Sequence, residues 1–441
     1  MHNNSISFLA HPGGTLQGEA RVPGDKSISH RSIMLGSLAE GITRVSGFLD
    51  AEDCLATLAA FRAMGVRIER PDDGQVVIHG VGLNGLTPPR EPLYLGNSGT
   101  SMRLLSGLLS GQAFDTVLTG DASLSRRPMK RVTLPLARMG ARIETTAAGT
   151  APLHVHGGVK LDGIRYDMPV ASAQVKSCLL LAGLYAQGET QVREPAPTRD
   201  HTERMLQGFG YPIRVEGDTI SLTGGGSLTA ASIDVPSDIS SAAFFMVGAA
   251  MTEGADVSLH HVGINPTRTG IIHILRLMGA TIEISHERSI GGEPVADIRV
   301  RGGQLRGIDI PEDQVPLAID EFPALFIAAA SARGTTRLTG AEELRVKESD
   351  RIQVMADGLR VLGIQAEPTP DGIVIQGGTL TEGCVDSHGD HRIAMAFAMA
   401  ALRSQGCIRI QDCANVNTSF PGFVALARHL GLKLDTTGEP A

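Results

Sequence analysis

The sequence predicts an α/β fold built from six copies of one repeat and divided into two domains. Six segments begin at a small polar or acidic residue, run through an apolar stretch and stop at a glycine 14–16 residues later. A short alternating strand follows each stop, and a second, amphipathic stretch then ends in a large apolar residue and a glycine. Self-similarity at this period indicates one supersecondary unit used repeatedly.

The six apolar segments are expected to be buried helices. Serine, asparagine and aspartate are N-cap residues, and glycine commonly ends a helix. Residues 324–330 (ALFIAAA) are apolar nearly all round, as in a helix with no side facing solvent. The predicted helices start at Ser27, Asn97, Ser172, Asp238, Asp320 and Asp390 and stop at Gly41, Gly111, Gly188, Gly254, Gly334 and Gly406.

Strands and outer helices complete each repeat. Alternating apolar and polar residues predict strands after the stops, as at residues 43–45 (TRV) and 336–338 (TRL). The amphipathic helices that follow are expected to end in a glycine C-cap. Their predicted ends are Met64-Gly65, Met139-Gly140, Phe209-Gly210, Met278-Gly279, Leu362-Gly363 and Leu430-Gly431.

The last repeat lacks a strand that the N-terminal segment could supply. The last repeat lacks its closing strand, whereas residues 5–11 and 16–22 are strand-like and precede the first repeat. We therefore expect the N-terminal segment to close the last sheet. Pro23-Gly24 and Val235-Pro236 suit hinges between domains. The predicted domains are residues 1–22 plus 237–441 and the inserted residues 23–236, with three repeats each and the active site in the cleft between them.

The composition argues against several classes of function. The 441 residues carry a net charge of −8, with 4% aromatic residues and no tryptophan, so we expect no nucleic-acid partner. No apolar stretch reaches the roughly 20 residues of a membrane helix. The first 25 residues resemble neither a signal nor a transit peptide, and the five cysteines lack disulfide or zinc spacing. These features predict a cytoplasmic protein with no membrane partner and no metal.

Residues 24–31 (GDKSISHR) bring cations to the start of the first buried helix. Lys26 and Arg31 would lie beside backbone N–H groups and a positive dipole end, which together favour an anion. Neither the P-loop pattern nor a dinucleotide fingerprint occurs in the chain. We therefore expect no ATP, no NAD and no other cofactor.

Charged residues recur at equivalent loop positions in the other repeats. Taken singly, Asp320 and Asp390 could be N-caps and His391 could be a structural histidine. Recurrence in register with the repeat instead favours sites for two anionic groups, phosphate or carboxylate, which arginine binds bidentately. The stretches are 96–103 (GNSGTSMR), 126–131 (RRPMKR), 172–176 (SAQVK), 345–351 (RVKESDR) and 390–392 (DHR).

Together with residues 24–31, these stretches make the chain resemble the 5-enolpyruvylshikimate-3-phosphate (EPSP) synthase family over essentially its whole length. Residues 199–203 and 265–268 are similar to the second, bacterial class of that family. The resemblance implies a two-domain, inside-out, barrel-like α/β fold of six βαβαββ repeats. It also implies transfer of the enolpyruvyl group of phosphoenolpyruvate to the 5-hydroxyl of shikimate 3-phosphate, with loss of phosphate by addition and elimination.

The resemblance also implies roles for individual residues. Asp320 would be the base for the 5-hydroxyl with Lys347 nearby, and Glu348 and Lys26 would move protons at the methylene carbon. Asn97, Ala173 and Lys347 would complete the substrate-binding set. Shikimate 3-phosphate would be held by Ser27, Arg31, Ser172, Gln174 and Arg199, and phosphoenolpyruvate by Lys26, Gly99, Arg127, Arg351 and Arg392.

Two alternatives remain open. A UDP-N-acetylglucosamine enolpyruvyl transferase usually follows its first lysine with asparagine and carries a loop cysteine, whereas Ser27 follows Lys26 here and residues 121–131 contain no cysteine. A non-catalytic anion-binding scaffold would not need Asp320, Lys347 and Glu348 together.

The chain departs from the first class of the EPSP synthase family at Thr418, where that class has lysine. We expect the protein to be a monomer.

Overall fold

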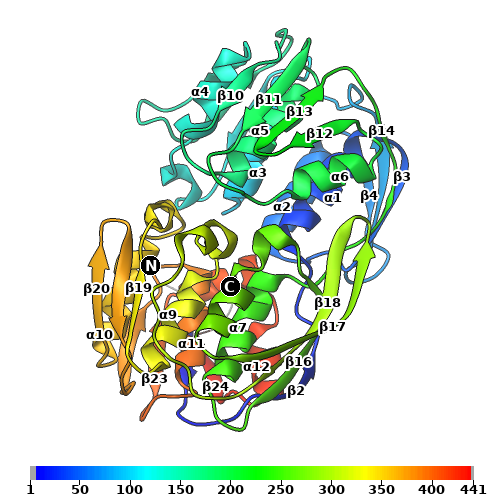
Figure 1. Cartoon of the computed structure of the whole chain (residues 1–441). Coiled ribbons are helices and arrows are strands. Elements are labelled where there is room, and N and C mark those ends of the chain that lie inside the picture. The colour runs from blue at the N-terminus through cyan, green and yellow to red at the C-terminus, as the bar shows by residue number, and fades with distance from the viewer. Residues whose placement is uncertain (1–5, 439–441) are drawn as a thin grey trace. The chain divides into compact units, whose positions relative to one another are not determined.

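The computed structural model of the protein describes residues 6–438 (Figure 1). Its contacts divide the chain into two compact units. Unit 1 contains the chain up to Pro23, Pro236–Arg288 and the chain from Pro294 onward, and unit 2 contains Gly24–Val235 and Ser289–Glu293. Each unit has a hydrophobic core of its own.

Unit 2 contains three sheets that repeat one pairing pattern. Its strands are β3 (Ala39–Ser46), β4 (Arg67–Glu69), β5 (Val76–Val81), β6 (Leu93–Tyr94), β7 (Thr116–Thr119), β8 (Arg142–Glu144), β9 (Leu153–His156), β10 (Arg165–Asp167), β11 (Glu189–Arg193), β12 (Ile213–Glu216), β13 (Thr219–Thr223), β14 (Leu228–Thr229) and β15 (Ser232–Asp234). The orders are β14-β3-β5-β4 (with β15 also on β3), β6-β7-β9-β8 and β10-β11-β13-β12. In each sheet a parallel pair is followed by two antiparallel pairs.

In unit 1 two sheets repeat this order with strands from the N-terminal segment, whereas the third sheet, which consists of three strands, has only the two antiparallel pairs. The strands of unit 1 are β1 (Ser7–Ala10), β2 (Gln17–Ala20), β16 (Asp256–Gly263), β17 (Thr281–Ile290), β18 (Glu293–Arg301), β19 (Thr335–Leu338), β20 (Gln365–Thr369), β21 (Gly372–Gln376), β22 (Gly383–Asp386), β23 (Ile408–Gln411) and β24 (Leu434–Thr437). The orders are β17-β18-β16-β2, β19-β21-β20 and β22-β23-β1-β24. β1 therefore lies inside the last sheet, antiparallel to both β23 and β24.

Six buried helices form the centres of the two units. They are α1 (Lys26–Leu38), α3 (Gly99–Ser110), α5 (Ala173–Gly183), α7 (Ile239–Ala250), α9 (Phe322–Ser331) and α11 (His391–Ala400). Figure 1 shows α7, α9 and α11 packed together within unit 1, each also contacting the sheet of its own repeat. All residues of α7 are buried, which agrees with its uniformly apolar sequence.

The predicted starts of three buried helices are wrong by one or two residues. Asp25 caps α1 in place of Ser27, because its Oδ1 accepts the N–H of Ile28 at 2.9 Å. Ser98 caps α3 in place of Asn97, and Glu321, without a capping side chain, precedes α9 in place of Asp320. Ser172, Asp238 and Asp390 cap α5, α7 and α11 as predicted.

The predicted C-terminal ends of these helices are wrong in all but one case. Gly111 is the C-cap of α3 as expected. The other helices end earlier, and Gly41, predicted to stop α1, lies inside β3 with φ of 107°. Gly188, Gly254, Gly334 and Gly406 come after a further short segment of chain, so they terminate the loop rather than the helix.

The outer helices end where the sequence predicts. The glycine that follows each helix adopts a left-handed conformation, with φ between 78° and 111°. Such a residue closes the last turn and is accessible to glycine at little cost. The helices are α2 (Glu52–Ala63), α4 (Lys130–Arg138), α6 (His201–Gly208), α8 (Gly270–Leu277), α10 (Arg351–Val361) and α12 (Phe423–His429).

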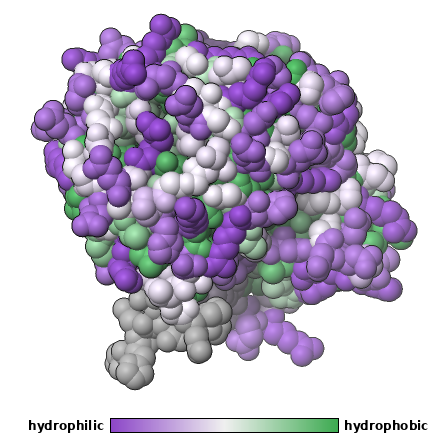
Figure 2. Space-filling model, turned by 90° about the horizontal axis from the view of Figure 1, so that it is seen from below, coloured by the Kyte–Doolittle hydropathy of each residue, from purple (hydrophilic) through white to green (hydrophobic). Residues whose placement is uncertain are grey.

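Short 3₁₀ turns complete the described chain. They are η1 (Leu124–Arg126), η2 (Pro266–Arg268), η3 (Glu312–Gln314), η4 (Pro316–Ala318), η5 (Glu342–Val346) and η6 (Ala414–Thr418). On the face seen in Figure 2, hydrophobic residues are scattered among a majority of hydrophilic ones. None of the helices in residues 6–438 has the length and apolar character needed to cross a bilayer.

Close packing of α3 on α5 gives a test of this fold. A Cβ at Gly107 would lie 2.1 Å from the backbone oxygen of Cys178, so the two helices would have to separate. We expect Gly107→Ala to destabilise the protein by about 1–3 kcal/mol and to lower the thermal unfolding temperature. Gly303→Ala is the control, because a Cβ there meets no atom within 4 Å. Equal unfolding temperatures for both variants would contradict this packing.

Candidate active site

Two groups of charged and polar residues lie at or near the N-terminal ends of helices, one group in each unit. We call the group in unit 2, around Lys26, Arg31, Arg127 and Gln174, the cationic cluster. We call the group in unit 1, around Asp320, Glu348, Arg351, Asp390 and Arg392, the carboxylate cluster. The described parts of the chain contain no group of three His, Cys, Asp or Glu residues arranged to hold a metal ion.

Arg31 is a buried cation whose hydrogen bonds go to neutral oxygens. Its Nε donates to Thr202 Oγ1 at 2.7 Å, Nη2 to Ser177 Oγ at 2.8 Å and Nη1 to the Ser27 carbonyl at 2.9 Å. Its exposed fraction is 4%. Burial lowers the pKa of Arg31 to about 10, so the guanidinium is still charged at neutral pH. A charge that is removed from water with neutral partners is well suited to receive an anion.

Lys26 lies in the first turn of α1 and forms an ion pair with Asp53 of α2. His30, one turn further, is buried and its Nδ1 lies 2.8 Å from Thr57 Oγ1. Burial, together with the charges of Lys26 and Arg31, lowers the pKa of His30 well below its usual value. The neutral imidazole adds no charge, so the lysine and the arginine are the cations of this helix start.

A second part of the cationic cluster forms where α3 begins. Arg127 Nη2 donates to Asn97 Oδ1 at 2.6 Å, and Asn97 Nδ2 donates to Asp121 Oδ2 at 2.8 Å. A Cβ at Gly99 would lie 2.9 Å from Arg127 Nη1. Residue 99 must therefore be small for the guanidinium of Arg127 to keep its place.

The start of α5 presents Ser172, Ala173 and Gln174. Ser172 Oγ accepts the N–H of Val175 as the N-cap, and Ala173 opens the helix. Gln174 bridges to α3, because its Oε1 accepts from Arg103 and its Nε2 donates to Thr100 Oγ1 at 3.1 Å. The starts of α3 and α5 are thus joined by a polar contact.

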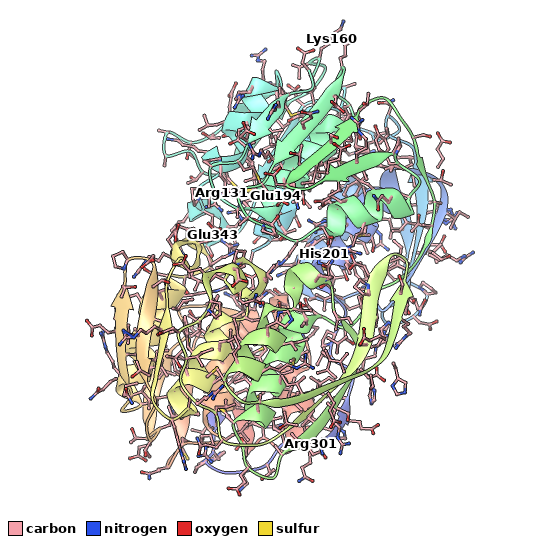
Figure 3. The ribbon with its side chains drawn as sticks, viewed as in Figure 1. Arg131, Lys160, Glu194, His201, Arg301 and Glu343 are labelled. Carbon is pink, nitrogen blue, oxygen red and sulfur yellow. The ribbon has the colours of Figure 1, made fainter. Side chains whose placement is uncertain are left out.

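Lys176, one turn into α5, has a structural role. It is fully buried, and its Nζ lies 2.6 Å from Glu203 Oε1 and 3.0 Å from Glu194 Oε1 (Figure 3 labels Glu194). Burial raises the pKa of Glu194, although Lys176 acts in the opposite direction. Thr198 donates to the same carboxylate, so this ion pair fixes the segment that leads to Arg199.

Arg351 is the centre of the carboxylate cluster. Its Nε donates to Asp390 Oδ2 at 2.8 Å, Nη2 to Glu348 Oε2 at 2.6 Å and Nη1 to Asp320 Oδ1 at 3.3 Å. Burial alone would lower the pKa of Arg351, but the three carboxylates outweigh burial and raise it. In contrast to Arg31, this guanidinium is already neutralised by protein groups.

Asp320 has cations on several sides. Lys347 Nζ lies 3.4 Å from its Oδ1, and Arg392 Nη1 donates to its backbone carbonyl at 3.0 Å. Lys347 also approaches Glu343 of η5 at 3.8 Å (labelled in Figure 3). The site predictions for Asp320, Lys347, Glu348, Arg351 and Arg392 therefore concern residues in mutual contact within one unit.

The sequence reasoning missed several polar partners. Asp53 and Arg103 lie outside the motif residues given a role, although both contact them. Arg268 is buried and donates to Asp238 Oδ1 at 3.2 Å and to Ser240 Oγ at 2.7 Å. In the sequence, residues 265–268 indicate only a similarity to the second class of the EPSP synthase family. The signal that could have found Arg268 is an arginine at or just before the start of an outer helix, as in the repeats that contain Arg199 and Arg351.

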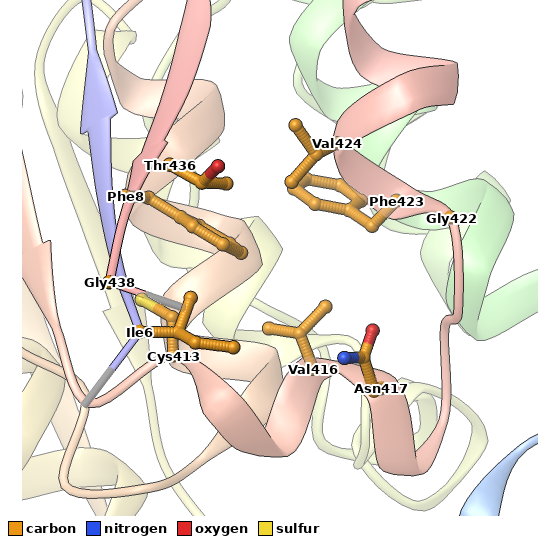
Figure 4. A pocket seen from close by; sticks show the side chains of 10 residues that line it. All are labelled: Ile6, Phe8, Cys413, Val416, Asn417, Gly422, Phe423, Val424, Thr436 and Gly438. Carbon is orange, nitrogen blue, oxygen red and sulfur yellow. The ribbon is translucent and has the colours of Figure 1, made fainter. Parts of the chain in front are cut away.

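A pocket in unit 1 is lined by residues that belong to neither cluster. It has a volume of about 190 Å³ between the N-terminal strand, η6 and α12 (Figure 4). The described residues that line it are uncharged. The lining residues are Ile6, Phe8, Cys413, Val416, Asn417, Gly422, Phe423, Val424, Thr436 and Gly438.

Comparison with known proteins identifies the family. Residues 10–426 match the sequence model of EPSP synthase (3-phosphoshikimate 1-carboxyvinyltransferase). A 3-phosphoshikimate 1-carboxyvinyltransferase from Methylococcus capsulatus is 71% identical over 437 residues, which cover 99% of this chain and 100% of the relative. The chain belongs to the EPSP synthase family. A further relative of the same name, from Nitrosococcus oceani, is 68% identical over 98% of this chain and 97% of its own length.

Solved structures agree with this membership of the EPSP synthase family. EPSP synthase from Acinetobacter baumannii has a TM-score of 0.88 and 61% identity, covering 98% of this chain and all of that one. The enolpyruvyl transferase NikO from Streptomyces tendae has a TM-score of 0.78 at 17% identity over 99% of this chain and all of its own, a likeness of fold alone. The predicted family, fold class and transferase activity are confirmed.

The two arginine environments predict different effects on stability. Arg351→Met would leave the fully buried Asp390 without its main cation, so we expect a loss of about 3–5 kcal/mol. Arg31→Met leaves Thr202 and Ser177 hydrogen-bonded to each other at 2.7 Å, and we expect a loss of only about 1 kcal/mol. Calorimetric unfolding of both variants measures the difference. Equal losses would contradict the assignment of Arg351 as the neutralised centre.

Proposed function

We propose that the residues of the cationic cluster and of the carboxylate cluster serve one reaction, in which the enolpyruvyl group passes from phosphoenolpyruvate to the 5-hydroxyl of shikimate 3-phosphate. The observation that carries this proposal is Arg31, a buried guanidinium with neutral hydrogen-bond partners at a helix start. Family membership supports the same reaction, because the relatives are named for transfer of a carboxyvinyl group to 3-phosphoshikimate.

The acceptor would be held by residues of α1, α5 and the segment before α6. Arg31 and Arg199 supply positive charge for its phosphate, and Ser27 and Ser172 supply hydroxyl groups at two helix starts. Ala173 and Gln174 would lie against the ring of the acceptor, with Gln174 held in place by Arg103.

Phosphoenolpyruvate carries a phosphate and a carboxylate, and both need cations. The proposed ligands in unit 2 are Lys26, Asn97, Gly99 and Arg127, where the small Gly99 leaves room beside the guanidinium. Unit 1 would supply Lys347, Arg351 and Arg392. Since Arg351 is already bound to three carboxylates, it would contact phosphoenolpyruvate only by exchanging part of this shell.

The chemistry requires a base for the hydroxyl and a proton donor for the methylene carbon. Asp320 would take the hydroxyl proton while the oxygen bonds to C2 of the enolpyruvyl group. Glu348 or Lys26 would protonate C3, which gives a tetrahedral intermediate. Breaking the C2–O bond to phosphate and removing a proton from C3 then restores the double bond and releases phosphate.

We further propose that the enzyme is monomeric and cytoplasmic, and that it serves the shikimate pathway of aromatic amino-acid biosynthesis. The five free cysteines suit a reducing compartment. The scattered hydrophobic residues on the face in Figure 2 are consistent with a surface that is exposed to solvent.

Phosphate release tests the choice of acceptor. We expect release from phosphoenolpyruvate with shikimate 3-phosphate and none with UDP-N-acetylglucosamine. Release only with the UDP-sugar would refute the proposal in favour of the sister enzyme. Absence of release with either acceptor would favour a non-catalytic anion-binding scaffold.

Substitution of Asp320 tests the base. Asp320→Ala should lower kcat by about 10²–10⁴-fold, while the Kd for shikimate 3-phosphate changes by less than about twofold. Single-turnover phosphate release and calorimetric binding measure the two quantities. The exposed Asp309→Ala is the control for loss of one acidic side chain in the same unit. Near-normal turnover of Asp320→Ala would rule out the base assignment.

A further inference from the structure

The β17–β18 hairpin contributes to both units. Its strands continue the sheet of β16 in unit 1, whereas its tip, Ser289–Glu293, is part of unit 2. The turn is formed by Gly291 and Gly292, both with positive φ, as a tight two-residue hairpin requires. The strands have 10 and 9 residues, longer than a typical strand of five or six.

Two contacts fix the tip on the start of α6. Glu293 Oε1 lies 2.8 Å from His201 Nδ1, and Arg204 Nη1 donates to the Gly292 carbonyl at 2.9 Å. The Glu293 and His201 side chains are only 7% and 3% exposed. Burial disfavours the charged carboxylate, but His201 outweighs burial and the pKa of Glu293 is lowered. A buried contact between a carboxylate and a histidine ring adds little net stability, but it fixes the positions of both side chains.

The start of α6 carries the proposed acceptor ligands. Arg199 lies two residues before His201, and Thr202 directly after it accepts the Nε hydrogen of Arg31 at 2.7 Å. In the sequence, His201 therefore lies between Arg199, a proposed ligand of the acceptor, and Thr202, which orients Arg31. The charge of Glu293 is one of several that partly offset the lowering of the Arg31 pKa by burial.

The same segment is also fixed from within unit 2. Lys176 pairs with Glu203 of α6 and with Glu194, which in turn accepts from Thr198 (Figure 3 labels Glu194 and His201). The residues on both sides of Arg199 are thus bound to buried charges. One of these charges, Lys176, belongs to α5, and the other, Glu293, belongs to the hairpin tip, which is part of the same unit.

We propose that Glu293 is a positioning residue that, through His201, sets the start of α6 so that Arg199 and Arg31 meet the phosphate of the acceptor. This inference rests on the function proposed above. According to this inference, the affinity for the acceptor depends on the hairpin tip, whereas the rate of the chemical step does not depend on it.

The charge of Glu293 can be removed with little change of shape. In Glu293→Gln we expect the Kd and KM for shikimate 3-phosphate to rise about tenfold, with kcat and the KM for phosphoenolpyruvate unchanged. Amide hydrogen exchange of residues 200–208 should become faster in the ligand-free variant. The control is Glu283→Gln, which removes an exposed partner of Arg301 on the same hairpin and should change none of these quantities.

A second variant keeps the test decisive if Glu293→Gln does not fold. Arg204→Met removes the half-buried anchor of the Gly292 carbonyl and its ion pair with Asp200, which is itself only partly buried, and a smaller rise in the same Kd is expected. An unchanged Kd in the folded variants would overturn the inference even if their unfolding temperatures fell. Failure of the wild-type protein to release phosphate with shikimate 3-phosphate would instead overturn the proposed function, and the two failures are therefore distinguishable.

Discussion

The constraint on which the structure depends is that its central helices are buried on nearly every side. A helix such as α7 has no surface on which polar side chains could reach water. Its unsatisfied backbone groups must nevertheless find partners at the ends. Polar and charged residues are therefore concentrated at helix starts, where Asp25, Ser172 and Asp390 act as caps. The same burial that stabilises the cores thus creates the places where anions can bind.

The two clusters hold buried arginines in opposite ways. Arg31 is supported by hydroxyl and carbonyl oxygens, which orient the guanidinium but leave its charge uncompensated by a contacting carboxylate. Arg351 is surrounded by Asp320, Glu348 and Asp390 and serves to hold these carboxylates together. An enzyme that binds anions and also moves protons needs both arrangements. Arg31 suits recognition, and Arg351 organises the groups proposed for proton transfer.

Much of the fold could be predicted because each repeat is specified by patterns of residues that are close together in the sequence. The glycine stops of the outer helices are correct, since a left-handed C-cap depends on residues that are neighbours in the chain. The caps of α1 and α3 were misplaced because several capping residues stand side by side there, and periodicity does not say which one is used. Partners such as Ser177 for Arg31 and Glu293 for His201 lie 146 and 92 residues away, so no local pattern reveals them.

The position of β1 has a consequence for how the chain is made. Phe8 pairs with Ile410 and Thr436, so β1 is completed by strands that are synthesised about 400 residues later. At about 5–20 residues per second, the ribosome needs on the order of 20–80 s to deliver those partners. Apart from the five-residue hairpin tip, unit 2 emerges entirely within this interval and can fold while the first strand waits. Unit 2 can therefore fold before synthesis of unit 1, whose segments flank it in the sequence, is finished.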